Sequence, residues 1–169
     1  MANTPNIVLF HEVQKPRQWW ILLIIFGVAL VTWVSFVQQI VLGKPFGTNP
    51  GPDWLVWLLW LLFGIGFPIA WFYTKLVVEL TPNQLSIRFV PLVSRVIPLT
   101  DIKQFQAREY SPIKEYGGWG ARYAGKARLA YNVSGNQGVE LELHNGQKIM
   151  IGSQKPQALA MALEQAIIT

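Results

Sequence analysis

The chain has 169 residues, of which 51% are hydrophobic and 14% are charged, and its formal net charge is +5. A soluble domain of this size usually carries about a quarter charged residues, so the composition argues against an ordinary soluble protein. The sequence has no cysteine, which excludes disulfides, thiol nucleophiles and thiolate metal sites.

Two uncharged, apolar runs follow a polar lead at residues 1–18 and predict a pair of membrane-spanning helices. A helix needs roughly 20 mostly apolar residues to cross a bilayer, and residues 19–42 and 54–74 each meet that length. One such run could be the buried core helix of a soluble protein. Two in succession, joined by a polar loop at 43–53, favour a transmembrane hairpin. The first run is too long for the apolar core of a signal peptide, so we expect it to be retained.

The positions of the basic residues predict how this hairpin is oriented. Lys15 and Arg17 precede the first run and Lys75 follows the second, whereas the connecting loop holds only Lys44. Because basic residues favour the cytoplasmic side of a membrane, we expect both termini to be cytoplasmic and the loop at 43–53 to be extracytoplasmic.

The segment at 75–169 has a strand-like texture and predicts a small β domain. QLSIRFV alternates apolar and polar residues with the period of a half-buried strand, and SRVIPLTDIKQFQARE reads as one or two further strands. ARLAYNV and VELELHNGQKIMIG add three more, with Asn145-Gly146 predicting a type I′ hairpin turn and VSGNQG a hairpin connection. About seven short strands are typical of a small barrel or sandwich.

The last predicted element is an amphipathic helix at 156–168. Pro156 suits a first helical turn, and we expect the helix to cover an open end of the strands. The predicted fold class is therefore a two-helix transmembrane hairpin followed by a small β barrel or sandwich that a C-terminal amphipathic helix closes. The apolar stripe at helical spacing consists of Leu159, Ala162, Leu163, Ala166 and Ile167.

The opening of the β domain resembles the bacterial pleckstrin-homology-like membrane proteins. In VVELTPNQLSIRFVPLVSRVIPLTDIKQF a strand ends in a Thr-x-Asn turn, a second strand follows, and then comes an Ile-Pro-Leu-x-x-Ile segment. The resemblance covers residues 76–103 in detail and the remainder by strand count and terminal helix. It implies a cytoplasmic domain on a bacterial inner membrane, plasma or internal. The later YGGWG segment is similar to a group of uncharacterised bacterial membrane proteins, which implies no activity. The matching positions are Thr81, Asn83, Leu85, Ile87, Ile97, Pro98, Leu99 and Ile102.

Chemistry-bearing residues are few and do not gather into a recognisable constellation. His11 has no histidine or carboxylate neighbour at helical ligand spacing, and Glu140, four residues before His144, lies in a predicted strand, so we expect no metal site. No G-x-S-x-G elbow surrounds Ser134 or Ser153, whose positions favour turn and cap roles. We therefore predict no catalytic residues, no cofactor and no enzymatic activity.

Pro68 predicts a local irregularity inside the second apolar run. Its ring would clash with the carbonyl of Gly64, four residues earlier, so we expect a kinked helix with close packing, or else a moving hinge. Neither run contains a charged residue, so the usual markers of an ion or proton pathway are missing.

EYGGWGARYAG, at residues 115–125, is the segment most indicative of a binding function. Its glycines permit positive φ, yet it contains neither the G-x-G-x-x-G nor the Walker phosphate-binding pattern. Tyrosine, tryptophan and arginine anchor protein interfaces, and such residues also lie at lipid headgroups. The segment therefore has three possible interpretations: a long hairpin whose aromatic side chains pack on the domain, a protein-binding surface, or a lipid-contacting loop. The candidate partner- or lipid-binding residues are Tyr116, Trp119, Arg122, Tyr123, Lys126 and Arg128.

These observations favour binding over catalysis. We expect a membrane-tethered interaction module, an accessory or assembly factor for a membrane protein complex, that contacts its partner through the Tyr116–Tyr123 loop. The alternative is a membrane domain that senses anionic lipid, which the modest positive charge also fits. A transporter or enzyme subunit would need a partner chain to supply the missing polar groups, and the few basic residues make nucleic acid a poor fit.

Overall fold

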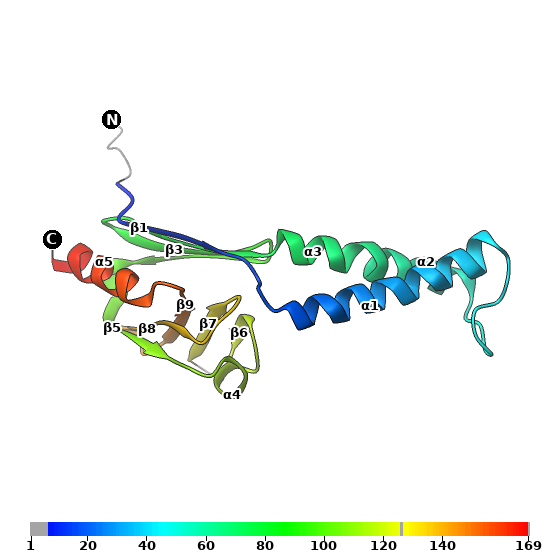
Figure 1. Ribbon diagram of the computed structural model, residues 1–169. Coiled ribbons are helices and arrows are strands. Elements are labelled where there is room, and N and C mark those ends of the chain that lie inside the picture. Colours follow the sequence, from blue (N-terminus) through cyan, green and yellow to red (C-terminus); the bar gives the residue numbers. More distant parts are fainter. Residues whose placement is uncertain (1–6, 126, 169) are drawn as a thin grey trace. The chain divides into compact units, whose positions relative to one another are not determined.

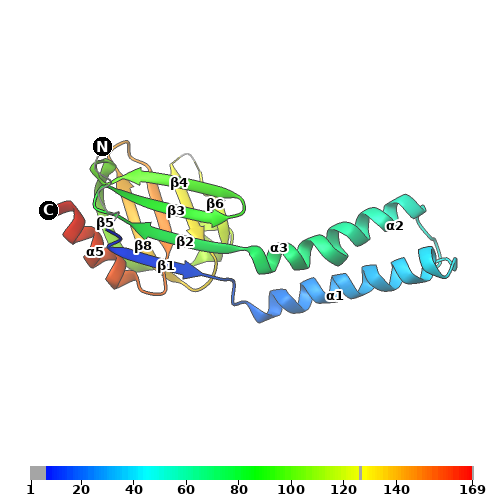
Figure 2. The same ribbon diagram turned by 90° about the horizontal axis from the view of Figure 1, so that it is seen from above.

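The computed structural model describes residues 7–125 and 127–168, and these form two compact units (Figures 1 and 2). A helical unit spans Gln18–Tyr73, and a strand-rich unit combines the segments on either side of it. The helical unit is thus inserted into the chain of the strand-rich unit, after its first strand.

Two long apolar helices make up the helical unit. Both are long and apolar enough to cross a membrane, judged by length and composition. Most of their large apolar side chains are exposed, so few are buried between the two helices. At the loop end, the side-chain amide of Gln39 donates to Asp53 Oδ1 at 2.8 Å. The first helix consists of α1 (Trp19–Phe36) and π-helical η1 (Val37–Val41); the second consists of α2 (Asp53–Leu59), π-helical η2 (Trp60–Gly66) and α3 (Phe67–Tyr73).

The irregularity predicted at Pro68 takes the form of the π-helical segment η2, which ends just before it. Pro68 has no N–H to offer the carbonyl of Gly64. That carbonyl instead accepts a hydrogen bond from the indole Nε1–H of Trp33, on the other helix, at 3.2 Å. A Cβ on Gly64 would lie 3.0 Å from the Trp60 ring, and Phe36 stacks on that ring at a centroid distance of 4.2 Å. Close aromatic packing therefore joins the helices at this point.

Four antiparallel strands in the order β1-β2-β3-β4 form the first sheet of the strand-rich unit. β2, β3 and β4 form a meander after the helical unit, whereas β1 lies in the segment predicted as a polar lead. β1 and β2 are direct neighbours, with Phe10 opposite Leu80 and Gln14 opposite Leu76. The strands are β1 (Phe10–Gln14), β2 (Lys75–Leu80), β3 (Gln84–Val90) and β4 (Val93–Pro98).

β1 was not predicted from the sequence, because the usual pattern of buried apolar and exposed polar side chains is reversed in it. Glu12 and Gln14 are buried, while the side chain between them is exposed. The Glu12 carboxylate accepts hydrogen bonds from Ser153 Oγ at 2.6 Å and from the Gln154 N–H at 2.8 Å. Gln14 donates through Nε2 to the carbonyl of Gly152 at 2.7 Å. These bonds tie β1 to the end of β9 and to the loop before the C-terminal helix.

Five strands in the order β5-β8-β9-β7-β6 form the second sheet. Neighbours are antiparallel except β7 and β9, which are parallel. β9 therefore lies between β7 and β8, so VSGNQG is a crossover and not the hairpin connection that we predicted. The two sheets remain separate, and the described residues form no closed barrel. The elements are η3 (Leu99–Asp101), β5 (Ile102–Glu109), α4 (Pro112–Tyr116), β6 (Gly120–Tyr123), β7 (Arg128–Asn132), β8 (Gln137–Leu143) and β9 (Lys148–Gly152).

The β8–β9 hairpin differs from the predicted type I′ turn. A type I′ turn needs positive φ at both central residues, but of Asn145 and Gly146 only Gly146 has it, at 81°. The Gly146 N–H donates to the carbonyl of Leu143, and the Leu143 N–H donates to the carbonyl of Gln147, both at 2.9 Å. The loop is therefore one residue longer than predicted, and Gly146 takes the left-handed position that ends it.

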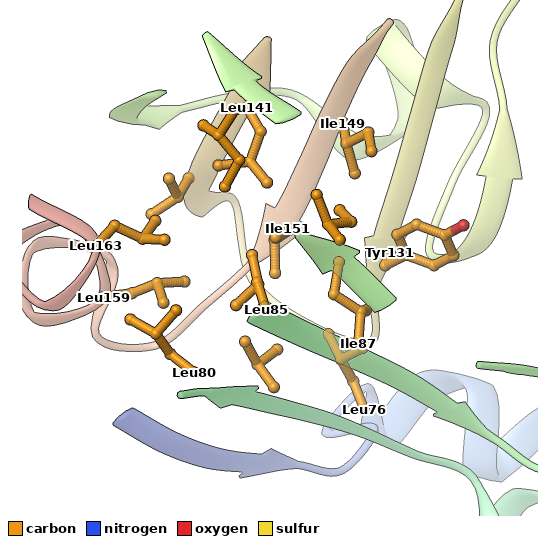
Figure 3. Packing of buried hydrophobic residues seen from close by; sticks show 14 of the residues in the cluster. Leu76, Leu80, Leu85, Ile87, Tyr131, Leu141, Ile149, Ile151, Leu159 and Leu163 are labelled. Carbon is orange, nitrogen blue, oxygen red and sulfur yellow. The ribbon is translucent and has the colours of Figure 1, made fainter. Parts of the chain in front are cut away.

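Both sheets and the C-terminal helix α5 (Pro156–Ile168) contribute to one hydrophobic core (Figure 3). Leu85 of the first sheet and Ile151 of the second are fully buried in it. Leu159 and Leu163 of α5 are fully buried in the same core, whereas Ile167, part of the predicted stripe, is exposed. The helix therefore closes the core through its first three turns.

Candidate functional site

A short helix and a glycine turn shape the aromatic segment singled out in the sequence. α4 follows β5 and has Pro112 in its first turn, where a missing N–H is tolerated. Gly117 ends the helix in the left-handed region at φ 72°, and its N–H donates to the carbonyl of Ile113 at 3.0 Å. Gly118 and Gly120 have φ of 125° and 126°. The chain thus reverses into β6 through a conformation that glycine adopts readily.

Tyr116 is buried within the domain. Its ring meets the ring of Tyr110 edge-on at a centroid distance of 6.0 Å, and the Arg128 guanidinium lies 5.2 Å from its ring centroid. The Tyr110 hydroxyl accepts a hydrogen bond from Asn132 Nδ2 at 2.9 Å, and Asn132 Oδ1 accepts one from the Gly120 N–H at 2.9 Å. Burial raises the pKa of Tyr110 to about 12. Tyr116 is therefore a packing residue, and Asn132 connects the Tyr110 hydroxyl to the glycine turn.

The remaining candidate residues do not gather on one surface. The indole N–H of Trp119 donates to the carbonyl of Gly135 at 3.0 Å, and Arg122 Nε donates to the carbonyl of Trp119 at 3.1 Å. Arg122 and Tyr123 are successive residues on β6, so their side chains lie on opposite faces of the sheet. Tyr123 is 65% exposed. Lys126 lies outside the described residues.

Arg108 is the centre of a charged network on the outward face of the second sheet. It donates to Glu115 at 2.8 Å and to Glu140 at 2.7 Å. Glu115 also accepts a hydrogen bond from the Ser111 N–H at 2.7 Å, and Arg128 lies 3.5 Å from it. The hydrogen bond from Arg108 holds the pKa of Glu115 below its usual range, and the same bond raises the pKa of Arg108.

A second network on the same face is centred on Glu142. Its carboxylate accepts hydrogen bonds from Lys103 Nζ and from Gln104 Nε2, each at 2.9 Å, and Lys148 Nζ lies 3.7 Å away. The hydrogen bond from Lys103 lowers the pKa of Glu142. The sequence analysis did not include these residues among the candidate binding residues. The alternation in VELEL could have indicated that Glu140 and Glu142 lie on the outward face of a strand.

The side chains on this face are charged, polar and aromatic. The described residues include no group of three or more histidine, aspartate or glutamate side chains placed to hold a metal ion. Glu115, Glu140 and Glu142 each accept a hydrogen bond from a cationic side chain. The arrangement therefore offers charge and partly covered aromatic surface for binding.

Residues 1–169 match the model of a family described as a family of unknown function, DUF6141. Because the match covers the whole chain, the protein belongs to this family. None of the curated proteins matches the sequence. The family description assigns no activity.

Proposed function

We propose that the protein is a non-catalytic binding module that a two-helix membrane hairpin tethers to the bilayer. The observation that carries this proposal is the exposed apolar surface of the two helices. Side chains such as Trp19, Leu30 and Leu61 are more than half exposed, and extensive apolar surface of this kind is unusual on a soluble protein. A bilayer removes that surface from water, and a helix satisfies its own backbone hydrogen bonds there.

The chain topology supports a hairpin rather than a single span. β1 precedes the first helix and β2 follows the second, and the two strands pair along the length of β1. Paired strands occupy one aqueous compartment, so the chain crosses the membrane an even number of times between Gln14 and Lys75. Two spans satisfy this condition. The flanking basic residues favour the cytoplasmic side for the strand-rich unit.

We further propose that the strand-rich unit is pleckstrin-homology-like. Two sheets around one core with a single closing helix agree with the arrangement that the sequence resemblance implies. In this interpretation β6 and β7 are an addition to the second sheet, because β5, β8 and β9 alone form a continuous antiparallel meander. This addition carries the aromatic segment.

We assign partner binding to the exposed part of the β6 addition and the adjoining α4. Tyr116 is buried, and the partly exposed Trp119 donates a hydrogen bond to the loop at Gly135. Tyr123 and Ile113 are 65% and 63% exposed, and Arg122 is exposed as well. Arg122 and Tyr123 lie on opposite faces of β6, the edge strand of the sheet, so a partner that contacts both has to bind around this edge. Tyrosine and arginine are residue types that anchor protein interfaces. The membrane tether favours a partner in the same membrane.

A pull-down of tagged full-length protein from its own membranes in mild detergent tests this assignment. We expect a defined membrane complex whose association Tyr123→Ala or Arg122→Ala weakens by about 1–4 kcal/mol. Met161→Ala, on the exposed face of α5, is the matched control and should leave the complex intact. Identical complexes in all variants would contradict the assigned surface. A protein that comes out alone would contradict partner binding and favour the alternative, recognition of anionic lipid.

A further inference from the structure

Two basic residues lie side by side on the outward face of the second sheet. Arg128 on β7 and Lys148 on β9 are direct Cα partners in the parallel pair. They share a face, because the next residues along the two strands, Leu129 and Ile149, pack toward the core. Like charges placed directly opposite each other in a sheet destabilise it. The repulsion between Arg128 and Lys148 therefore has to be offset by nearby negative charge.

The ion pairs within the protein compensate these two charges only weakly. Arg128 lies 3.5 Å from Glu115 and Lys148 lies 3.7 Å from Glu142, and the two basic side chains are 44% and 46% exposed. Ion pairs this long and this exposed contribute little. Both carboxylates, moreover, accept shorter hydrogen bonds from other cationic side chains. Lys103, Arg108, Arg128 and Lys148 share the three carboxylates of Glu115, Glu140 and Glu142, which leaves a net charge of +1 on this face.

An open hollow of about 460 Å³ lies in front of this pair. Three basic side chains and one acidic side chain line it, and the acidic one is already bound by Arg108. The excess of basic residues suits an anion. The lining residues come from β5, β7, β8, β9 and the turns between strands: Arg108, Ala127, Arg128, Glu140, Gly146 and Lys148.

We propose that this hollow binds the dianionic head of a phosphate monoester. A phosphate monoester carries about one and a half to two negative charges near neutral pH and has several strong acceptor oxygens, so Arg128 and Lys148 can both donate to it. The guanidinium of Arg128 can donate two parallel hydrogen bonds to such a group, and the ammonium of Lys148 adds a compact charge. Bound phosphate would replace the repulsion between the two side chains with attraction. This inference goes beyond the partner-binding module, and of its two basic residues only Arg128 is among the binding residues predicted from the sequence.

The soluble arm of the test uses glycerol 3-phosphate, a small phosphate monoester. Full-length protein in a neutral detergent is titrated at constant ionic strength, and binding is measured by calorimetry. We expect saturable binding that Lys148→Gln weakens about 10- to 100-fold, the loss expected for a hydrogen bond to a charged group. Arg88→Gln, which removes an equal charge on β3, should leave binding unchanged. Dimethyl phosphate, a monoanionic diester, should bind far more weakly.

The thermal stability of the ligand-free variants separates a binding role from a structural one. Lys148→Gln relieves the repulsion with Arg128, so its melting temperature should equal or exceed that of the wild type. If Lys148 served only to hold Glu142, the same substitution would lower the melting temperature. The effect of Arg128→Gln is harder to interpret, because this substitution also removes the contact with the Tyr116 ring. Lys148→Gln is therefore the deciding variant.

The membrane arm identifies the source of the phosphate. Full-length protein is placed in phosphatidylcholine nanodiscs that contain either phosphatidic acid, a monoester, or phosphatidylglycerol, a diester. Loss of glycerol 3-phosphate binding only in the phosphatidic acid discs would assign the site to a lipid headgroup. Retained binding in both kinds of disc would assign it to a soluble ester. Either outcome supports the proposed chemistry.

The proposal is overturned by any of three results. These are the absence of saturable glycerol 3-phosphate binding, equal losses for Lys148→Gln and Arg88→Gln, and equal affinities for the monoester and the diester. None of them bears on the pull-down with Tyr123→Ala, so the phosphate site and the partner surface can fail independently.

Discussion

Glu12, whose carboxylate anchors β1, allows a quantitative test of how the strand-rich unit is held together. Glu12→Ala removes a buried carboxylate that accepts hydrogen bonds from Ser153 and Gln154. A hydrogen bond to a charged group contributes about 1.5–3 kcal/mol, and a buried partner left unsatisfied costs about 1–3 kcal/mol. The Gln154 N–H is only partly buried, so water replaces some of its loss. We expect the free energy of unfolding to fall by about 2–4 kcal/mol.

The assay combines denaturant unfolding of the full-length protein in detergent with hydrogen exchange of the β1 and β2 amides. Glu12→Ala should speed exchange in β1 first, because its loop anchor is gone while its pairing with β2 remains. Glu12→Gln keeps the shape but offers a single acceptor oxygen, so its effect should be intermediate. His11→Ala, at an exposed position on the same strand, is the control. If Glu12→Ala matches His11→Ala in both measurements, the anchoring role of the carboxylate is refuted.

Three further predictions follow from the packing and the charges. Leu163→Ala, at a fully buried position on α5, should lower the free energy of unfolding by about 2–5 kcal/mol in denaturant titration; an effect under 1 kcal/mol would contradict the core position. Because Arg108 lowers the pKa of Glu115 in the folded protein, Glu115 stabilises the fold above its ordinary pKa of 4.5, and this contribution fades as the pH falls through the folded value. The stability deficit of Glu115→Gln should therefore be constant near neutral pH and shrink below about pH 4.5, as unfolding at a series of pH values would reveal. Trp33→Phe removes the indole donor to Gly64 and should weaken packing between the two helices, so a cysteine cross-link across them should form less efficiently than in the parent protein. Unchanged cross-linking would mean that the hydrogen bond contributes nothing.

The strands with regular alternation could be predicted from the sequence. QLSIRFV and VELEL place apolar residues on one face, and both segments are strands whose apolar residues are buried. β1 could not be found in this way, because Glu12 and Gln14 face inward and find hydrogen-bond partners 138 or more residues away. Hydrophobic periodicity detects strands whose buried side chains are apolar. It does not detect a strand whose buried side chains are polar and hydrogen-bonded.

Strand order was also beyond local reasoning. The hairpin interpretation of VSGNQG assumed that consecutive strands pair, which is the common case. Here β9 lies between β7 and β8, and the parallel pairing depends on contacts distant in sequence. At the candidate site, the glycines correctly predicted positive φ, but composition could not tell that Tyr116 is buried while Tyr123 is exposed. The charged partners of Arg128 became visible only once the strands were in register.

The separation of β1 from β2 in sequence also fixes an order of events during synthesis. β1 leaves the ribosome well before its partner strand, and the whole helical unit is made in between. Closing so long a flexible loop would carry a considerable entropic cost. A formed helical hairpin brings the end of β1 close to the start of β2, and most of this entropic cost is then removed. The domain can thus be completed only after the helical unit has been synthesised. Because Gln14 and Leu76 are already opposite each other, a short Asn-Gly turn joining the two strands should yield a chain that folds without any membrane.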